Sequence, residues 1–287
     1  MGIIINPYQV QAAADAIVTP PFDDYGSPSA GYSMRKLDSS YSGSAIRVRE
    51  DSGNTEADIG FDSSGDLDIN SPSGLLAHVG SNSGFIVKWY DQSGNSYDIT
   101  QVTTTAQPKI VDSGSVVEIN GKPAILYDGS TDFMVQTSSM GFNGSTAEVN
   151  QYSVQQMLSS DVTSIYIGGQ NNVYYWVLQS GSSSTAIDSY CGPPTFYKNG
   201  TVISSPTRDS LFTAYNTDAQ TLASLTGLNM QYFNTTPTTN FNISNALGGS
   251  SGWRMNAYIQ ELLFWRATDL PTQADVETNI NDYYTIF

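Results

Sequence analysis

The run Trp89-Tyr90-Asp91-Gln92-Ser93-Gly94-Asn95 ends an apolar segment and begins a polar turn. Residues 85–89 before it alternate as in a strand that places one face in a core, with Phe85, Val87 and Trp89 together on that face. After the strand, Asp91 and Asn95 offer side-chain acceptors and Gly94 tolerates positive φ, which stops the strand. We therefore expect a buried Trp89 and a turn that Asp91 and Asn95 brace.

Two further turns are signalled by Asn-Gly pairs. Asn120-Gly121 and Asn199-Gly200 each separate two short apolar segments, and this dipeptide accepts the positive φ values of a type I′ hairpin turn. Near the end of the chain, Thr272 and Asp275 have the spacing of a helix N-terminal cap. The helix that follows places Val276, Ile280 and Tyr283 on one face. The chain thus reads as strands and turns with few short helices.

Composition limits the classes of function. The 287 residues carry 11 basic and 27 acidic side chains, a net charge of −16, which argues against nucleic acid and anionic membranes as partners. No apolar run approaches the length that spans a bilayer, and the first residues lack the features of a signal peptide. Cys191 and His78 are the only residues of their kinds, so zinc sites and Cys/His or Ser/His catalysis are not expected.

The first 26 residues differ from the rest, and we expect an N-terminal anchoring arm over 1–26 and a single β domain over 27–287. The arm has an apolar start and a short helical pattern that ends at a proline pair. An isolated sandwich has little reason to cover this apolar surface, so the arm is expected to attach the protein to a neighbouring subunit. The anchor residues are Ile3, Ile4, Ile5, Val10 and Ile17.

Three segments together indicate a family. Trp89 to Asn95, Tyr32-Ser33-Met34-Arg35-Lys36-Leu37 and Ser44-Ala45-Ile46-Arg47-Val48-Arg49 resemble the catalytic domain of the arabinofuranosidase B family and of phage virion proteins related to it. The resemblance covers the chain from about Gly31 to Phe287. It implies an all-β fold: a concanavalin A-like (laminin G-like) jelly-roll sandwich of antiparallel sheets with short helices and an N-terminal arm.

The same resemblance bears on catalysis. A retaining glycosidase needs two carboxylates roughly 5 Å apart. The family's acid follows a late Gly-Gly, where this chain has Gly248-Gly249-Ser250, and residues 164–169 contain no Glu to act as nucleophile. The expectation is therefore a protein that is not an enzyme.

This expectation leads to one main interpretation of the function, with two alternatives. The chain would be a phage structural protein, capsid-decorating or tail-associated, made in the host cytoplasm, with other virion proteins as partners, self-association into a homo-oligomer and a capacity to bind glycans. The alternatives are a glycan-active hydrolase of the arabinofuranosidase B type and a ligand-free cement protein.

Two sets of residues are candidates for binding. Asp62, Asp66 and Asp68 crowd one oxygen-rich segment that has the ligand type of a calcium site, although a solvated turn explains the pattern as well. Calcium is the one cofactor that the sequence suggests. Trp253, in a predicted loop, and Tyr175, on a predicted strand, are the candidates for stacking on a sugar ring, with burial in the core as the alternative for Tyr175.

Overall fold

The computed structural model describes most of the chain. The described residues are 18–26, 28–136, 138, 148–158, 163–168, 174–184, 194–229, 242–244, 254–266 and 271–287, with the backbone alone at 163–168, 174–177, 229 and 242. The predicted anchor residues Ile3, Ile4, Ile5, Val10 and Ile17 lie outside this set.

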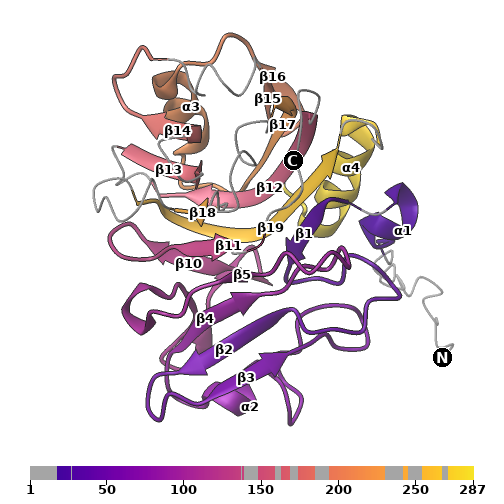
Figure 1. Cartoon of the computed structure of the whole chain (residues 1–287), viewed down its shortest axis with the longest axis vertical. Coiled ribbons are helices and arrows are strands. Elements are labelled where there is room, and N and C mark those ends of the chain that lie inside the picture. The colour runs from indigo at the N-terminus through magenta and orange to yellow at the C-terminus, as the bar shows by residue number, and fades with distance from the viewer. Residues whose placement is uncertain are drawn as a thin grey trace, which may run out of the picture.

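Strands dominate the described residues, as Figure 1 shows. The first half contains α1 (Pro21–Tyr25), β1 (Ala30–Ser33), β2 (Ile46–Glu50), β3 (Glu56–Ile59), α2 (Leu75–Val79), β4 (Gly84–Trp89), β5 (Ile99–Thr100), the 3₁₀ helix η1 (Thr104–Ala106), β6 (Lys109–Asp112), β7 (Ser115–Val116), β8 (Glu118–Ile119), β9 (Lys122–Pro123), β10 (Ile125–Asp128) and β11 (Met134–Gln136). The second half contains β12 (Glu148–Met157), β13 (Thr163–Gly168), β14 (Tyr174–Gln179), β15 (Thr195–Lys198), β16 (Thr201–Ile203), α3 (Arg208–Tyr215), β17 (Thr221–Asn229), β18 (Asn242–Ile243), β19 (Asn256–Arg266) and α4 (Gln273–Tyr284).

The strands pair antiparallel into two layers. In one layer β19 pairs with β12 along one edge and with β1 and β10 along the other, and β12 continues through β17 to β15 and β16. The other layer runs from β3 through β2, β4, β5, β11 and β18 to β13 and β14. Figure 1 shows β12 and β19 curving side by side through the centre, with α4 beside β19. The predicted all-β antiparallel sandwich is confirmed.

Trp89 lies in the main core, as predicted, but the predicted strand face is wrong. Trp89 is 0% exposed and packs against Tyr32, with 5.8 Å between ring centroids. Its buried neighbour on β4 is Ile86, whereas Phe85 and Val87 are only partly buried. The register shifts here, since Ile46 and Arg47 pair with Trp89 and Lys88 but Val48 pairs with Ile86. This β-bulge leaves Val87 as the extra residue and breaks the alternation that the sequence suggests.

The polar turn after Trp89 ties β4 to the chain around β1. Asp91 accepts hydrogen bonds from the backbone N–H of Ser93 at 3.0 Å, of Tyr97 at 3.1 Å and of Gly31 at 2.9 Å. Gln92 accepts from the N–H of Leu37 at 2.8 Å and donates to carbonyls at residues 33 and 35. Asp91 thus braces its own turn as predicted, and the turn also holds residues 31–37 in place.

Both predicted hairpin turns form. Asn120 and Gly121 have φ values of 49° and 72°, and Asn199 and Gly200 have 49° and 75°. These left-handed values join β8 to β9 and β15 to β16. The dipeptides therefore act through the backbone freedom that the prediction assumed.

A second core forms between the β19 layer and α4. The helix begins at the predicted cap, where the Thr272 hydroxyl accepts from the N–H of Asp275. Val276, Ile280 and Tyr284 are buried in this core. Tyr283, which the sequence placed with them, is only partly buried. No helix in the described part of the chain is both long and apolar enough to cross a membrane.

The described end of the predicted arm packs on this second core. Phe22 of α1 is 6% exposed, and its ring lies edge-on to Trp265 at 5.7 Å. Trp265 also donates to the carbonyl of Gly26 at 3.4 Å. Residues 20–26 are therefore held by the sandwich, and attachment of the arm to another subunit stays a prediction.

A buried ion pair lies between β1, β19 and α4. Arg35 donates two hydrogen bonds to the Glu261 carboxylate, at 2.8 and 2.9 Å, and their side chains are 4% and 0% exposed. The Ser33 hydroxyl donates to the same carboxylate at 2.7 Å. The Arg35 guanidinium carbon lies 4.6 Å from the centre of the Tyr283 ring. Each charge is thus paired and hydrogen-bonded, as burial requires.

Glu261→Gln should destabilise the fold by about 3–5 kcal/mol, because it leaves the Arg35 charge buried without a counter-ion. Denaturant titration measures the loss. The control is Asp58→Asn, which removes the partner of Arg47 from a pair whose side chains are both 38% exposed, and should cost less than about 1 kcal/mol. Equal losses in the two variants would contradict the assigned role of the buried pair.

Trp89→Ala should cost about 3–5 kcal/mol in the same titration, since it opens a cavity in the main core. Val102, which is 84% exposed, provides the control: Val102→Ala should change stability by less than about 0.5 kcal/mol. A loss below about 1 kcal/mol for Trp89→Ala would show that the tryptophan does not support the core.

Candidate functional site

The turn between β10 and β11 is organised by Asp128. Its carboxylate accepts from the backbone N–H groups of Ser130, Thr131 and Asp132 at 2.8 to 3.0 Å. It also accepts from the hydroxyls of Ser130 and Thr131, at 2.6 and 3.0 Å. Partial burial alone would raise the pKa of Asp128, but these donors hold the pKa below its usual range. Asp128 is therefore ionised at neutral pH.

Asp132, at the end of the same turn, behaves differently. It is 8% exposed, and its Oδ2 accepts from the N–H of Asp128 at 3.1 Å. Burial, and then the negative charge of Asp128, raise the pKa of Asp132 to about 7. Two neighbouring carboxyl groups thus have pKa values pushed apart, a pattern that recurs where one group donates a proton.

Arg254 lies beside this turn because of the pairing of β10 with β19. Asn256 pairs with Asp128, and the N–H of Gly129 donates to the carbonyl of Met255 at 3.0 Å. The Arg254 guanidinium carbon lies 4.3 Å from the centre of the Phe133 ring. Burial lowers the pKa of Arg254, partly offset by the charges of Asp128 and Asp132.

The hydrogen bonds of Arg254 are incomplete. The residue is 7% exposed, Nη1 donates to the carbonyl of Ser244 at 3.0 Å, and Nε has no acceptor among the described residues. Ser244 and Arg254 flank residues 245–253, the segment that contains Ser250. We call Asp128, Asp132, Phe133, Ser244 and Arg254 the β10–β11 corner.

Sequence reasoning missed this corner. The sequence Asp128-Gly129-Ser130-Thr131-Asp132 is typical of a turn, and a turn forms there. The sequence does contain one signal of the corner: Asp132, the second carboxyl of the turn, lies directly before an apolar strand, where burial raises the pKa of an acid. Its position beside Arg254 depends on pairing of β10 with β19, whose paired residues are at least 128 positions apart (Asp128 with Asn256), and is not visible in local sequence.

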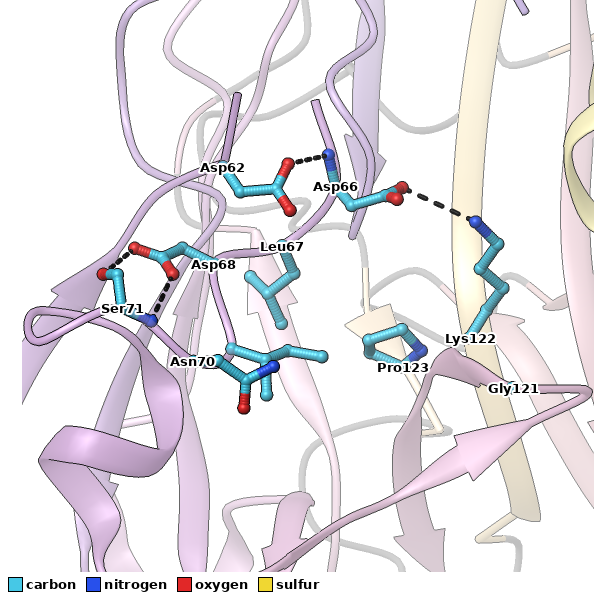
Figure 2. A pocket seen from close by; sticks show the side chains of 10 residues that line it. Asp62, Asp66, Leu67, Asp68, Asn70, Ser71, Gly121, Lys122 and Pro123 are labelled. Carbon is cyan, nitrogen blue, oxygen red and sulfur yellow. Dashed lines mark hydrogen bonds and ion pairs between the residues drawn. The ribbon is translucent and has the colours of Figure 1, made fainter. Parts of the chain in front are cut away.

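The predicted calcium ligands line a pocket of about 330 Å³, shown in Figure 2. Asp62, Asp66 and Asp68 line the pocket, and Lys122 lines it from the β8–β9 hairpin. The Lys122 Nζ forms an ion pair with Asp66 Oδ1 at 3.6 Å. The Tyr283 hydroxyl also donates to Asp66. The three aspartates therefore lie in a concave part of the surface, which the β8–β9 hairpin helps to form.

The carboxylates in this pocket bind groups of the protein. Asp62 accepts from the N–H of Ser64 at 2.8 Å and of Asp66 at 3.1 Å, and Asp68 accepts from the N–H and hydroxyl of Ser71. Among the described residues, no three His, Cys, Asp or Glu side chains are grouped so that they could hold a metal ion. Calcium binding here stays a prediction.

The two predicted sugar-stacking residues are not placed. Trp253 lies outside the described residues, and so does Ser250. For Tyr175 the structure describes only the backbone, in β14. Their proposed roles stay predictions.

Comparison with solved structures identifies the fold. The chain is similar to an arabinofuranosidase complexed with arabinofuranosyl-α-1,2-xylobiose, with a TM-score of 0.57 and 13% identity. It is also similar to a GH54 α-L-arabinofuranosidase soaked with a cyclic sulfate inhibitor (TM-score 0.56, 14% identity), and to a mutant GH54 enzyme soaked with 4-nitrophenyl α-L-arabinofuranoside (0.52, 14%). Each match covers 92% of this chain, which spans 64% of the matched structure's length. No protein-family model and no curated sequence matches.

These matches correct one prediction. The expectation that the chain is not an enzyme is contradicted, because the structures that share its fold are glycoside hydrolases. That expectation rested on the absence of a carboxylate at two sequence positions, which leaves room for an acid elsewhere in the fold, such as Asp132. None of the matches is a phage protein, so similarity to the arabinofuranosidase fold is the supported part of the resemblance.

The raised pKa of Asp132 predicts a pH dependence of stability. The folded pKa is about 7 and the unfolded pKa is about 3.9, so the folded state binds more protons between these values. The contribution of Asp132 to stability should therefore fall as pH rises from about 4 to about 7. Unfolding titrations across this range should show that the decline is smaller in Asp132→Asn. Identical pH profiles would contradict the raised pKa.

Proposed function

We propose that the chain acts on glycans as a glycoside hydrolase in which Asp132 is the proton donor. The observation that carries the proposal is a buried carboxyl group with a pKa of about 7 in a fold similar to that of arabinofuranosidases. A general acid works best when its pKa lies near the working pH. Asp132 meets that condition.

The geometry defines how Asp132 would act. Because Oδ2 accepts the N–H of Asp128, Oδ1 is the oxygen that holds the proton. Transfer of this proton to the glycosidic oxygen lets the leaving group depart as an alcohol, while a water oxygen forms the new bond to the anomeric carbon and releases its own proton to solvent. Asp128 is not the attacking carboxylate, since the donors of its own turn occupy its oxygens. Its role is to keep a negative charge beside Asp132.

The choice of substrate class comes from the fold. The solved structures with this fold contain arabinofuranosyl ligands, so arabinofuranosides are the first substrates to test. Display on a capsid or tail, partners among virion proteins and self-association are further proposals, which rest on the resemblance alone. They concern where the protein works and do not conflict with activity on glycans.

The test uses purified protein with 4-nitrophenyl α-L-arabinofuranoside and a panel of other nitrophenyl glycosides. Wild type should release nitrophenol at a rate that falls above about pH 7, and Asp132→Asn should lower kcat about 10²–10⁴-fold. Asp112→Asn, which changes an exposed carboxylate paired with Lys109, should leave the rate unchanged.

A second substrate separates loss of the acid from general damage. A 2,4-dinitrophenyl glycoside has a leaving group that needs little protonation, so Asp132→Asn should retain most activity on it. Wild-type activity of a folded Asp132→Asn protein on the mononitrophenyl substrate would overturn the assignment. Absence of wild-type turnover on the whole panel would count against hydrolysis itself.

A further inference from the structure

Arg254 makes fewer hydrogen bonds to described residues than Arg35, Arg47 and Arg49, the other arginines whose contacts the structure describes in full. Arg35 and Arg47 each form two hydrogen bonds to one carboxylate. Arg254 has no carboxylate within ion-pair distance among the described residues, although the residue is only 7% exposed.

Arg49 shows that burial without a carboxylate can be fully accommodated. It is also 7% exposed and stacks on a phenylalanine, yet it donates to Gln107 at 2.7 Å, to Asn54 at 2.7 Å and to the carbonyl of Thr104 at 3.4 Å. Among the described residues, Arg254 has a single acceptor, the carbonyl of Ser244, and its buried Nε has none. Of these two similarly buried guanidinium groups, only that of Arg49 has an acceptor for each of its nitrogens among the described residues.

An unsatisfied buried cation is costly to the folded state. A guanidinium has five N–H donors in a rigid planar fork, which matches groups with two parallel acceptor oxygens, carboxylate or phosphate. On a glycan, the carboxylate of a uronic acid is such a group. The Phe133 ring fixes the plane of the guanidinium. The side chain is thus oriented before any ligand arrives.

We propose that Arg254 binds the carboxylate of an acidic sugar, a uronic acid unit of the glycan on which the β10–β11 corner acts. This inference rests on the proposed function and adds the substrate class to it. The two acids whose charges act on Arg254 are Asp128 and Asp132. Asp132 is half protonated at about pH 7 and increasingly protonated below it. Asp128 remains as one fixed negative charge, which offsets part of the attraction by Arg254.

The test measures binding by titration calorimetry at pH 6 in an Asp132→Asn background, so that no turnover occurs. The probes are digalacturonic acid and the neutral disaccharide arabinobiose. The protein should bind digalacturonic acid at least tenfold more tightly than arabinobiose. Arg254→Gln should remove this preference, whereas Arg254→Lys, which keeps the charge and loses the fork, should keep only part of it.

Arg47→Gln is the matched control, because it removes an exposed arginine that already has a partner, and the preference should persist in it. Thermal unfolding confirms that each variant is folded, and Arg254→Lys serves if Arg254→Gln fails to fold. Equal affinity for both probes, or an acidic preference that survives loss of Arg254, would overturn the inference. Acidic preference without hydrolysis in the wild type would reject the proposed function and leave the binding site standing.

Discussion

The Arg35–Glu261 ion pair fixes the central strand of the sandwich. Glu261 lies in β19, which pairs along one edge with β12 and along the other with β1 and β10. A slip of one residue would turn every side chain of β19 to the opposite face. Such a slip would move Glu261 away from Arg35 and leave both buried charges without a partner, so the pair specifies one register.

The register of β19 determines where the candidate site forms. Pairing of Asn256 with Asp128 brings Arg254, immediately before β19, beside the turn that holds Asp132. The turn has its own rigidity from the five hydrogen bonds to Asp128. A strand fixed at its middle and a turn fixed by its own side chain therefore meet at the corner. Neither element depends on a ligand for its position.

Local sequence predicted the parts of the fold that depend on local physics. The Asn-Gly turns, the Thr272 cap and the bracing by Asp91 follow from backbone freedom and short-range hydrogen bonds, and all three form. The face of β4 was wrong because the bulge at Val87 depends on pairing with β2. The β10–β11 corner was missed for the same reason, since a raised pKa and an unsatisfied arginine arise only from tertiary burial.

The prediction about catalysis failed for a related cause. The prediction depended on whether two particular positions carry carboxylates. At 13 to 14% identity, a fold similar to that of arabinofuranosidases does not require catalytic residues at the same positions. In the proposed function, Asp132 supplies the acid from another element of the same sandwich. The functional account therefore depends on the environment of that one carboxyl group.

The most direct measurement is the titration of the Asp132 carboxyl by carbon-detected NMR, with assignment by comparison with Asp132→Asn. The account predicts a midpoint near pH 7 for Asp132, whereas the pKa of Asp128 should lie below the usual range of an aspartate. A midpoint near pH 4, as for an ordinary aspartate, would mean that Asp132 is ionised at neutral pH and cannot be the proton donor.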